Sequence, residues 1–400
     1  MKKTIKDIDL TNKKVLLRVD FNVPLVSNDD KLIVADDNRI LAALPTIKYI
    51  LKQNAKLIIL SHLSRIKTKE DLKSKSLKPV VECFKKFVNN KVTFIEKTTG
   101  DEIKKFIDQM ENNEILFIEN TRFMDLENKA ESKKNDELSK YWASLGDVFI
   151  NDAFGITHRA HASNAGIAEN IKESAIGFLV ENEIEHLNKL KNPARPYLAI
   201  IGGAKISDKI QVLETLLNKA DKVLIGGAMA YTFNLARNVK IGKSLSEPEY
   251  VALAKKLLEK YKDKIVLPCD NAISKTFTNS VPLYTNAIDS HIDDNYEGMD
   301  IGKETIREFS NIIANAKTIF WNGPLGVCEF ENYSKGTEQI AIAIAKNEDA
   351  YSIVGGGDSV AAIKKLHYEN KFSFISTGGG ASLEYIQNKQ MPGIDSIQDK

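Results

Sequence analysis

Several features are scarce in this 400-residue sequence, and each absence excludes a class of protein. The three cysteines, Cys83, Cys269 and Cys328, lie far apart without a CxxC pair, so neither a disulfide framework nor a zinc site is expected. No apolar run approaches the ~20 residues that cross a bilayer, and the amino terminus lacks the apolar core of a signal peptide. We therefore expect a soluble, cytoplasmic protein that binds no membrane.

Excess charge is also lacking. The 56 lysines and arginines nearly balance 54 acidic residues, and a formal net charge of +2 gives no support to nucleic-acid binding. Arginine itself is rare, with only eight of the 56 cationic residues, yet five of the eight precede residue 160: Arg18, Arg39, Arg65, Arg122 and Arg159. Any positive field is therefore local.

The pattern of apolar residues indicates the α/β class. Short runs rich in Val, Ile, Leu and Phe alternate with longer amphipathic segments, as in parallel sheets covered on both faces. The chain is too long for one core, and apolar residues recur at helical spacing from Val180 to Leu190 before Pro193. We expect two Rossmann-like parallel-sheet domains with an active-site cleft between them, arranged as residues 1–172, a connecting helix 173–191, residues 192–385 and a tail 386–400.

Different residues follow the apolar runs in the two halves. Four of the five arginines follow runs in the first half, in KVLLRVDFNVP, AKLIILSHLSR, EILFIENTRF and DVFINDAFGITHRAH, whereas YLAIIGGAK, KVLIGGAMA, YSIVGGGDS and FSFISTGGGAS end in glycines. Parallel sheets bind ligands at the carboxyl ends of their strands. Arginine pairs with small anions, and glycine lets the backbone approach phosphates. The combination favours phosphoryl transfer.

In the first half, the period of two in VLLRVDFNV places Arg18, Asp20 and Asn22 on one face of a strand. One interpretation is an Arg18–Asp20 ion pair, with Asn22 at the end of the strand. The other is that Asp20 and Asn22 bind the hydroxyl groups of a ligand. Arg39 begins a helical stretch, where an exposed surface arginine is the simpler interpretation.

Two histidine-containing segments also belong to this half. His62 and Arg65 follow a strand, as Arg122 does, and arginines that converge at strand ends favour an anion site. His158 and His161 flank Arg159, but no nearby cysteine or acid completes a metal-ligand set around them.

In the second half, GGAKISDK places Lys205 and Lys209 on the first turns of a predicted helix, either as phosphate ligands or as surface lysines. GGGDSV places Asp358 and Ser359 at another helix start. Asp358 is either the N-cap of that helix or a ligand of Mg2+. A carboxylate repels phosphates, so the second role requires the ion to lie between Asp358 and the phosphates.

Two familiar nucleotide signatures are missing. Arg237 stands where a P-loop ending in Gly242–Ser244 needs glycine, and Val360 replaces the third glycine of a dinucleotide fingerprint. Neither a P-loop NTPase nor an ordinary Rossmann dehydrogenase fits.

Nine segments resemble phosphoglycerate kinases in order and spacing: RVDFNVPL, DNRI, SHLSR, ENTRF, NDAFGITHRAHAS, GGAKISDKI, WNGPLGVCEF, GGGDSVAAI and STGGGASLEY. The resemblance covers essentially the whole chain. It implies reversible transfer of the acyl phosphate of 1,3-bisphosphoglycerate to MgADP, giving 3-phosphoglycerate and MgATP, by a monomer whose domains close. It also implies that the C-terminal tail returns to the N-terminal domain.

The same resemblance implies roles for individual residues. In the N-terminal 3-phosphoglycerate-binding domain, Asp20 and Asn22 would hold the glycerate, and its phosphate would lie among Arg39, His62, Arg65, Arg122 and Arg159. In the C-terminal nucleotide-binding domain, the phosphates would bind Lys205, Lys209, Asn322, Gly356, Gly357 and Ser359. Asp358 would take Mg2+, Glu329 the ribose, and Gly298 would lie near the adenine. We expect Arg39, Lys205 and the N–H groups of Gly378 and Gly379 to stabilise the transferring group.

The chain departs from the family pattern at three positions: Ser64 and Ile66 replace glycine and proline of SHLGRP, and Lys303 replaces the proline of DIGP. Because Ser64 replaces glycine, we expect the loop that holds His62 and Arg65 to have a different backbone conformation. Two other functions stay open from sequence alone, a nicotinamide dehydrogenase and a non-catalytic anion-binding or surface adhesion protein.

Overall fold

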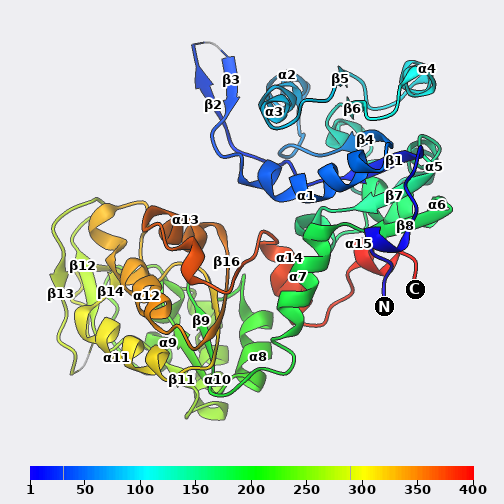
Figure 1. Ribbon diagram of the computed structural model, residues 1–400. Coiled ribbons are helices and arrows are strands. Elements are labelled where there is room, and N and C mark those ends of the chain that lie inside the picture. Colours follow the sequence, from blue (N-terminus) through cyan, green and yellow to red (C-terminus); the bar gives the residue numbers. More distant parts are fainter. Residues whose placement is uncertain (30, 289) are drawn as a thin grey trace. The chain divides into compact units, whose positions relative to one another are not determined.

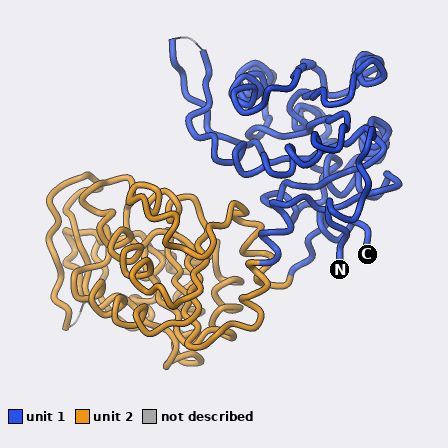
Figure 2. The backbone as a smooth tube through the Cα atoms, viewed as in Figure 1, with its two compact units in different colours: residues 1–185, 389–400 blue, residues 186–388 orange. Residues whose placement is uncertain are grey.

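The computed structural model describes residues 1–29, 31–288 and 290–400, and the chain divides into two compact units (Figure 2). Unit 1 comprises residues 1–185 and 389–400, and unit 2 comprises residues 186–388. Helix α7 (Phe178–Asn188) contains the point at which unit 1 passes into unit 2. The division of roles between the two parts remains a prediction.

Unit 1 is built on a parallel six-stranded sheet with the order β5-β6-β4-β1-β7-β8. The strands are β1 (Lys14–Arg18), β4 (Lys56–Leu60), β5 (Val92–Ile95), β6 (Ile115–Ile118), β7 (Val148–Asn151) and β8 (Glu173–Ile176). A hairpin of β2 (Leu25–Asn28) and β3 (Lys31–Val34) follows β1. The helices are α1 (Asn38–Lys52), α2 (Asp71–Ser74), α3 (Lys78–Phe84), α4 (Asp101–Gln109), α5 (Asp136–Ala143), α6 (Ile167–Asn170) and α15 (Pro392–Asp395).

The core of unit 1 shows why its apolar runs form strands. Val15 and Leu17 of β1 pack with alternate residues of β4, β6 and β7 and with the apolar faces of α1 and α3. Because side chains alternate across a strand, Leu16 and Arg18 lie on the opposite face of the sheet. Arg18 is completely buried there, so it requires polar partners within the protein.

Unit 2 has a parallel sheet with the order β11-β10-β9-β15-β16-β17, in which the chain moves outward from β9 to one edge and then from β15 to the other. Figure 1 labels β9, β11 and β16 of this sheet. The strands are β9 (Tyr197–Ile201), β10 (Lys222–Ile225), β11 (Ile265–Val266), β15 (Thr318–Asn322), β16 (Tyr351–Gly355) and β17 (Phe374–Ile375). This is the doubly wound order whose switch point, here between β9 and β15, holds ligands in open α/β sheets.

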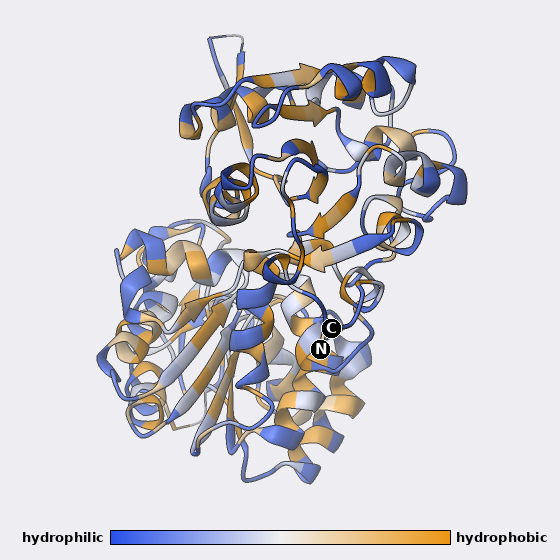
Figure 3. Ribbon diagram, turned by 45° about the vertical axis from the view of Figure 1, so that its right-hand side comes forward, coloured by the Kyte–Doolittle hydropathy of each residue, from blue (hydrophilic) through white to orange (hydrophobic). Residues whose placement is uncertain are grey.

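The remaining elements of unit 2 surround this sheet. A second, three-stranded sheet has the order β13-β12-β14, from β12 (Asn271–Ser274), β13 (Leu283–Tyr284) and β14 (Glu297–Ile301). The helices are α8 (Ile210–Lys219), α9 (Met229–Ala236), α10 (Val251–Lys260), α11 (Lys303–Ala314), α12 (Lys335–Lys346), α13 (Gly357–Lys365) and α14 (Gly380–Ile386). Alternate residues of β9 and β15, including Ile200 and Trp321, pack against α11, α12 and α13. Figure 3 shows the strands as largely hydrophobic and the outer turns of the helices as hydrophilic.

The chain termini lie together in unit 1. The N–H of Lys3 donates to the carbonyl of Gln398 (2.8 Å), and the N–H of Lys400 donates to that of Met1 (2.9 Å). Further along the tail, Gly393 exchanges hydrogen bonds with Thr157 and Asn151, each 2.8 Å. In the part of the chain that the structure describes, no helix has the length and hydropathy needed to cross a membrane.

Candidate functional site

In unit 1, the segment after β1 differs from the sequence prediction. The strand ends at Arg18, so Asp20 and Asn22 lie beyond it instead of sharing a strand face with Arg18. Of the two interpretations of this segment, the Arg18–Asp20 ion pair is not supported, because the ion pair of Asp20 is with Arg39. Burial alone would raise the pKa of Asp20, but the charges of Arg39 and Arg18 oppose this, and its pKa is lowered to about 2. Asp20 is therefore ionised at neutral pH.

Arg39 lies in the first turn of α1 and is only partly exposed, so the interpretation of it as an ordinary surface arginine is not supported. Its partner Asp20 approaches the NDAFG segment after β7 so closely that a Cβ on Gly155 would lie 2.5 Å from the Asp20 Oδ2 atom. A side chain at this position would displace the Asp20 carboxylate, so the loops that follow β1 and β7 meet at that carboxylate.

His62 is buried beside the same carboxylate, with 3.9 Å between its Nδ1 atom and Asp20 Oδ1. Its Nδ1 atom also lies 3.2 Å from a guanidinium nitrogen of Arg18. Since arginine only donates, Nδ1 accepts and the ring proton sits on Nε2. Burial and the charges of Arg18 and Arg122 hold the pKa of His62 well below 6.5, so the ring is neutral.

The other predicted residues of unit 1 divide into two groups. Asn22 and Arg122 are joined through Ser64, whose N–H donates to Asn22 Oδ1 and whose carbonyl accepts from the Arg122 guanidinium, both at 2.7 Å. Arg65 and Arg159 are exposed, and Arg159 donates to His158 Nε2 at 3.0 Å. Burial, followed by the positive charge of Arg159, lowers the pKa of Arg122, so these two guanidinium groups affect one another.

The sequence prediction missed the acid beneath this basic cluster. Glu131 is completely buried and accepts hydrogen bonds from the hydroxyl and the N–H of Ser163, while Arg18 Nε donates to the same hydroxyl at 2.8 Å. Burial raises the pKa of Glu131 and the charge of Arg18 opposes that rise. The signal that could have found such an acid is Arg18 itself, since a cation in a buried strand requires a counter-charge.

His161 lies next to this acid. Its Nδ1 atom is 3.7 Å from Glu131 Oε1, and burial with nearby arginine charges lowers the pKa of His161 to about 3. Among the described residues, no cluster of three His, Cys, Asp or Glu side chains is placed to hold a metal ion.

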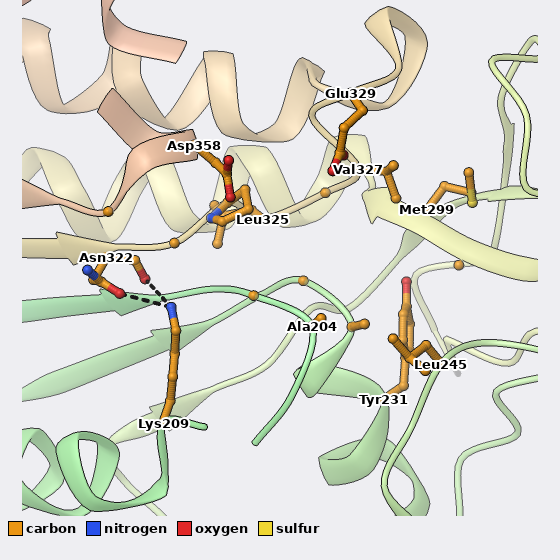
Figure 4. Close-up of a pocket in the computed structure, with 18 of the residues that line it drawn as sticks. Ala204, Lys209, Tyr231, Leu245, Met299, Asn322, Leu325, Val327, Glu329 and Asp358 are labelled. Atoms are coloured by element: carbon orange, nitrogen blue, oxygen red, sulfur yellow. Dashed lines mark hydrogen bonds between the residues drawn. The ribbon is translucent and has the colours of Figure 1, made fainter. Parts of the chain in front are cut away.

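In unit 2, a cavity of about 590 Å³ lies at the switch point between β9 and β15 (Figure 4). Glycines form much of its wall. The lining residues that the sequence analysis had assigned to the nucleotide site are Lys209, Gly298, Asn322, Glu329, Gly356, Gly357 and Asp358. The structure therefore brings seven of the predicted nucleotide-site residues to one cavity. Tyr231, Leu245, Phe277 and Met299 add an apolar portion that the sequence analysis did not identify.

Lys209 supplies a positive charge to the lining of this cavity. The structure also corrects where the helix that follows it begins. Helix α8 begins at Ile210, so Lys205 and Lys209 precede it. The Lys209 Nζ atom donates to the Gly202 carbonyl at 2.5 Å. It also donates to Asn322 Oδ1 (2.9 Å) and, at 3.3 Å, to the Asn322 carbonyl, and these two bonds are the dashed lines of Figure 4. Burial lowers the pKa of Lys209 to about 8, although the charges of Asp358 and Asp208 oppose that shift.

Asp358 and Ser359, both predicted site residues, lie in the first turn of helix α13, but one is exposed and the other is buried. Gly356 is its N-cap, with a φ of +94°, so the interpretation of Asp358 as the N-cap is wrong. Asp358 instead lies in the first turn, exposed and lining the cavity. Ser359 is fully buried, and its hydroxyl accepts the N–H of Gly323 at 3.0 Å, which braces the loop after β15.

Three predicted catalytic residues do not line the cavity. Lys205 is exposed, and its charge acts on Glu247. The N–H of Gly378 donates to Ser376 Oγ at 3.2 Å, and Gly379 is the N-cap of α14 with a φ of +53°. The roles of all three in the reaction remain predictions.

Comparisons of the sequence with known proteins lead to one family. Residues 5–389 match the family model described as phosphoglycerate kinase. Over 400 residues, covering the whole of both chains, the sequence is 54% identical to the phosphoglycerate kinase of Enterococcus faecalis and 55% identical to that of Listeria innocua.

Solved structures lead to the same family. The phosphoglycerate kinase of Coxiella burnetii superposes with a TM-score of 0.85 at 37% identity, covering 99% of this chain and 98% of that one. The enzyme of Pyrococcus horikoshii superposes with a TM-score of 0.85 at 31% identity, covering 98% of each chain. With its family-model match, its full-length relatives and its structural neighbours in agreement, the chain belongs to the phosphoglycerate kinase family.

Proposed function

We propose that this enzyme, a glycolytic phosphotransferase of the phosphoglycerate kinase family, holds its two substrates on the residues described above. The reaction is the reversible transfer of the acyl phosphate of 1,3-bisphosphoglycerate to ADP. The bond between the acyl oxygen and phosphorus breaks, and a β-phosphate oxygen of ADP bonds to that phosphorus, giving 3-phosphoglycerate and ATP. We further propose that the chain acts as a monomer on these small molecules.

On the acceptor side, Asp20 and Asn22 would bind the hydroxyl and carboxyl region of the glycerate. Its phosphate would lie among Arg39, His62, Arg65, Arg122 and Arg159. Support comes from the contacts within unit 1: a neutral His62 with its proton on Nε2 is a hydrogen-bond donor, and the buried Arg122 is a fixed cation. Arginine's planar fork matches phosphate oxygens.

On the nucleotide side, Lys205, Lys209, Asn322, Gly356, Gly357 and Ser359 would hold the phosphates, Glu329 the ribose, and Gly298 would border the adenine. Support comes from the cavity itself, where backbone N–H groups at the start of α13 and the Lys209 ammonium lie within one wall. The apolar side chains of Tyr231, Leu245 and Phe277 give a base an apolar surface.

Magnesium fits this cavity through Asp358. Mg2+ is bound in such sites by one or two carboxylates together with substrate phosphates and water, and Asp358 is an exposed carboxylate on the cavity wall beside the proposed phosphate ligands. When bound, the ion would neutralise phosphate charge, and Asp358 would hold it against the phosphates.

The protein itself has little covalent chemistry to perform. The attacking and leaving groups are already anionic near neutral pH, so no general base is required, and positioning with charge neutralisation supplies the catalysis. Arg39, Lys205 and the N–H groups of Gly378 and Gly379 would stabilise the transferring phosphoryl group. The domain closure expected from the sequence is part of this proposal, since closure would keep water from the acyl phosphate.

The observation that carries the proposal is the glycine-walled cavity with Lys209, Glu329 and Asp358 at the switch point of unit 2. The test is an assay with 3-phosphoglycerate and MgATP, coupled to reduction of the acyl phosphate formed. Turnover that requires both substrates supports it. Binding of NAD without kinase turnover would favour a dehydrogenase, and anion binding without turnover would favour a non-catalytic role; either result would overturn the proposal.

A further inference from the structure

The loop Ser61–Ile66 carries His62 and Arg65, two of the residues that we propose bind the phosphoglycerate. Its backbone is strained at Ser64, whose φ of +57° lies in the left-handed region that favours glycine. A loop that contains such a residue keeps its shape only when surrounding contacts determine it. The structure shows what those contacts are.

Asn120 provides two of them, both to Leu63. It lies two residues after the end of β6, is completely buried and uses all four hydrogen-bonding positions of its side-chain amide. Its Oδ1 atom accepts the N–H groups of Leu63 and Arg122, both at 3.1 Å. Its Nδ2 atom donates to the carbonyls of Leu63 (2.8 Å) and Lys75 (2.9 Å).

The two bonds to Leu63 have a specific consequence. A side-chain amide that bonds both the N–H and the carbonyl of one residue fixes that residue's backbone as a neighbouring strand would. Leu63 lies between His62 and Ser64, so both neighbours are placed with it. The bond to the Arg122 N–H ties the same amide to the start of the ENTRF turn, and Arg122 in turn donates to the Ser64 carbonyl at 2.7 Å.

We propose that Asn120 is a positioning residue for the acceptor substrate, which holds His62 and Arg65 in register with Arg122. This inference rests on the proposed binding of phosphoglycerate by these three residues. Asn120 is buried and has no role in binding the substrate directly. Its effect is to fix where the donors lie, and misplacement by about 1 Å can cost on the order of 10²-fold in rate.

The test is Asn120→Ser in the full-length enzyme. A serine hydroxyl can still accept the N–H two residues ahead, which preserves the local turn to Arg122, but it is too short to reach Leu63 or Lys75. We expect the KM for 3-phosphoglycerate to rise by on the order of tenfold to a hundredfold. The KM for ATP should stay within about twofold, because Asn120 belongs to unit 1 and the nucleotide cavity to unit 2.

A matched control is Asn347→Ser. The Asn347 Nδ2 atom also bonds two backbone carbonyls, those of Ile313 (2.7 Å) and Ala316 (2.9 Å), but in unit 2 and away from the lining of the nucleotide cavity. Its substitution should lower the melting temperature without changing either KM. A merely structural role for Asn120 would give the same result as this control.

A folded Asn120→Ser enzyme whose KM for 3-phosphoglycerate lies within twofold of the unsubstituted enzyme would overturn the inference, as would an equal rise in both KM values. If the serine variant does not fold, the isosteric Asn120→Asp variant decides by the same two KM values. It keeps the two accepted bonds, loses the two donated ones and turns an acceptor oxygen toward the carbonyls of Leu63 and Lys75. Failure of the proposed function would be distinct, because the unsubstituted enzyme would then show no turnover of 3-phosphoglycerate.

Discussion

The side-chain ammonium of Lys209 lies 2.9 Å from Oδ1 of Asn322, so that a residue just before α8 is tied to the last residue of β15. The same ammonium donates to the carbonyl of Gly202, immediately after β9. One cation therefore joins the two strand ends that flank the switch point of unit 2. These acceptors are neutral oxygens, and they do not offset the free-energy cost of burying the charged ammonium.

This arrangement predicts the pH dependence of nucleotide use. Because burial lowers the pKa of Lys209 to about 8, the free enzyme loses this positive charge as the pH rises through that value. We expect kcat/KM for ADP to fall above about pH 8, measured from pH 6.5 to 9.5 at constant ionic strength. Lys209→Met should have a lower kcat/KM that no longer falls there. An unchanged profile in that variant would contradict the prediction.

Ser64→Gly should stabilise the protein. A left-handed residue with a side chain costs roughly 1–2 kcal/mol, and glycine gives back part of this through its greater freedom in the unfolded chain. We expect the free energy of unfolding of unit 1 to rise by about 0.5–1 kcal/mol in chemical denaturation. As a control, Ser310→Gly, inside helix α11, should lower stability by about 0.5–1 kcal/mol. A loss of stability in Ser64→Gly would show that the serine side chain has a favourable role.

Features that depend on neighbouring residues could be predicted from the sequence. The buried strands appear as apolar runs because both faces of each sheet are covered, and Gly356, Gly357 and Asp358 stand at a helix start as their spacing indicates. The period of two in VLLRVDFNV was misleading past Arg18. Phe21 stays buried after the chain has left the sheet, so the alternation of apolar residues continues beyond the strand.

Features that depend on distant partners could not be predicted. Arg18 bonds Ser163, 145 positions away, and Asn120 bonds Leu63, 57 positions away. The late start of α8 has a similar cause, because Glu247 accepts the N–H of Ser207 at 3.0 Å and holds the preceding turn out of the helix. Local pattern identifies a residue that needs a partner, but only the fold identifies the partner.

Asp300 should make stability depend on pH. Its carboxylate is buried in β14, where it accepts the N–H groups of Gly336 (2.6 Å) and Ile301 (2.8 Å). Burial outweighs these bonds and raises the pKa of Asp300 from 3.8 to about 8. Between those values the folded protein binds more protons than the unfolded chain, so this group lowers stability as the pH rises.

We therefore expect the pH dependence of unit 2 stability to weaken in Asp300→Asn, measured by urea denaturation at pH 6 and pH 8.5. The variant should be less stable than the unsubstituted protein at pH 6 by about 1–3 kcal/mol, because an amide nitrogen replaces one of the two acceptors. The same loss of stability between pH 6 and 8.5 in both proteins would show that Asp300 does not titrate in this range.

Asp358→Asn should chiefly weaken the use of magnesium. The substitution removes the proposed carboxylate ligand from the cavity wall while keeping the size of the side chain. We expect the Mg2+ concentration for half-maximal rate to rise by at least about tenfold. Asp208→Asn is the matched control, since Asp208 also acts on the Lys209 charge but does not line the cavity. Unchanged Mg2+ dependence in Asp358→Asn would remove Asp358 from the metal site.

Arg39→Ala separates catalysis from stability most directly. In the Arg39–Asp20 pair 36% of the arginine side chain but only 13% of the aspartate side chain is accessible, so the loss of Arg39 should cost about 1–3 kcal/mol of stability. If Arg39 neutralises the transferring group, kcat should nevertheless fall by on the order of 10²–10⁵, and Lys205→Ala should behave alike because Lys205 is exposed.

Arg39→Lys tests what Arg39 contributes beyond its charge. Lysine keeps the positive charge but lacks the planar fork, so an intermediate kcat would show that geometry contributes beyond charge alone. Stopped-flow or coupled turnover at saturating substrates, with melting temperatures measured in parallel, gives both quantities. An Arg39→Ala or Lys205→Ala enzyme that keeps more than a tenth of normal kcat would rule out that residue as a stabiliser of the transition state, whatever its effect on folding.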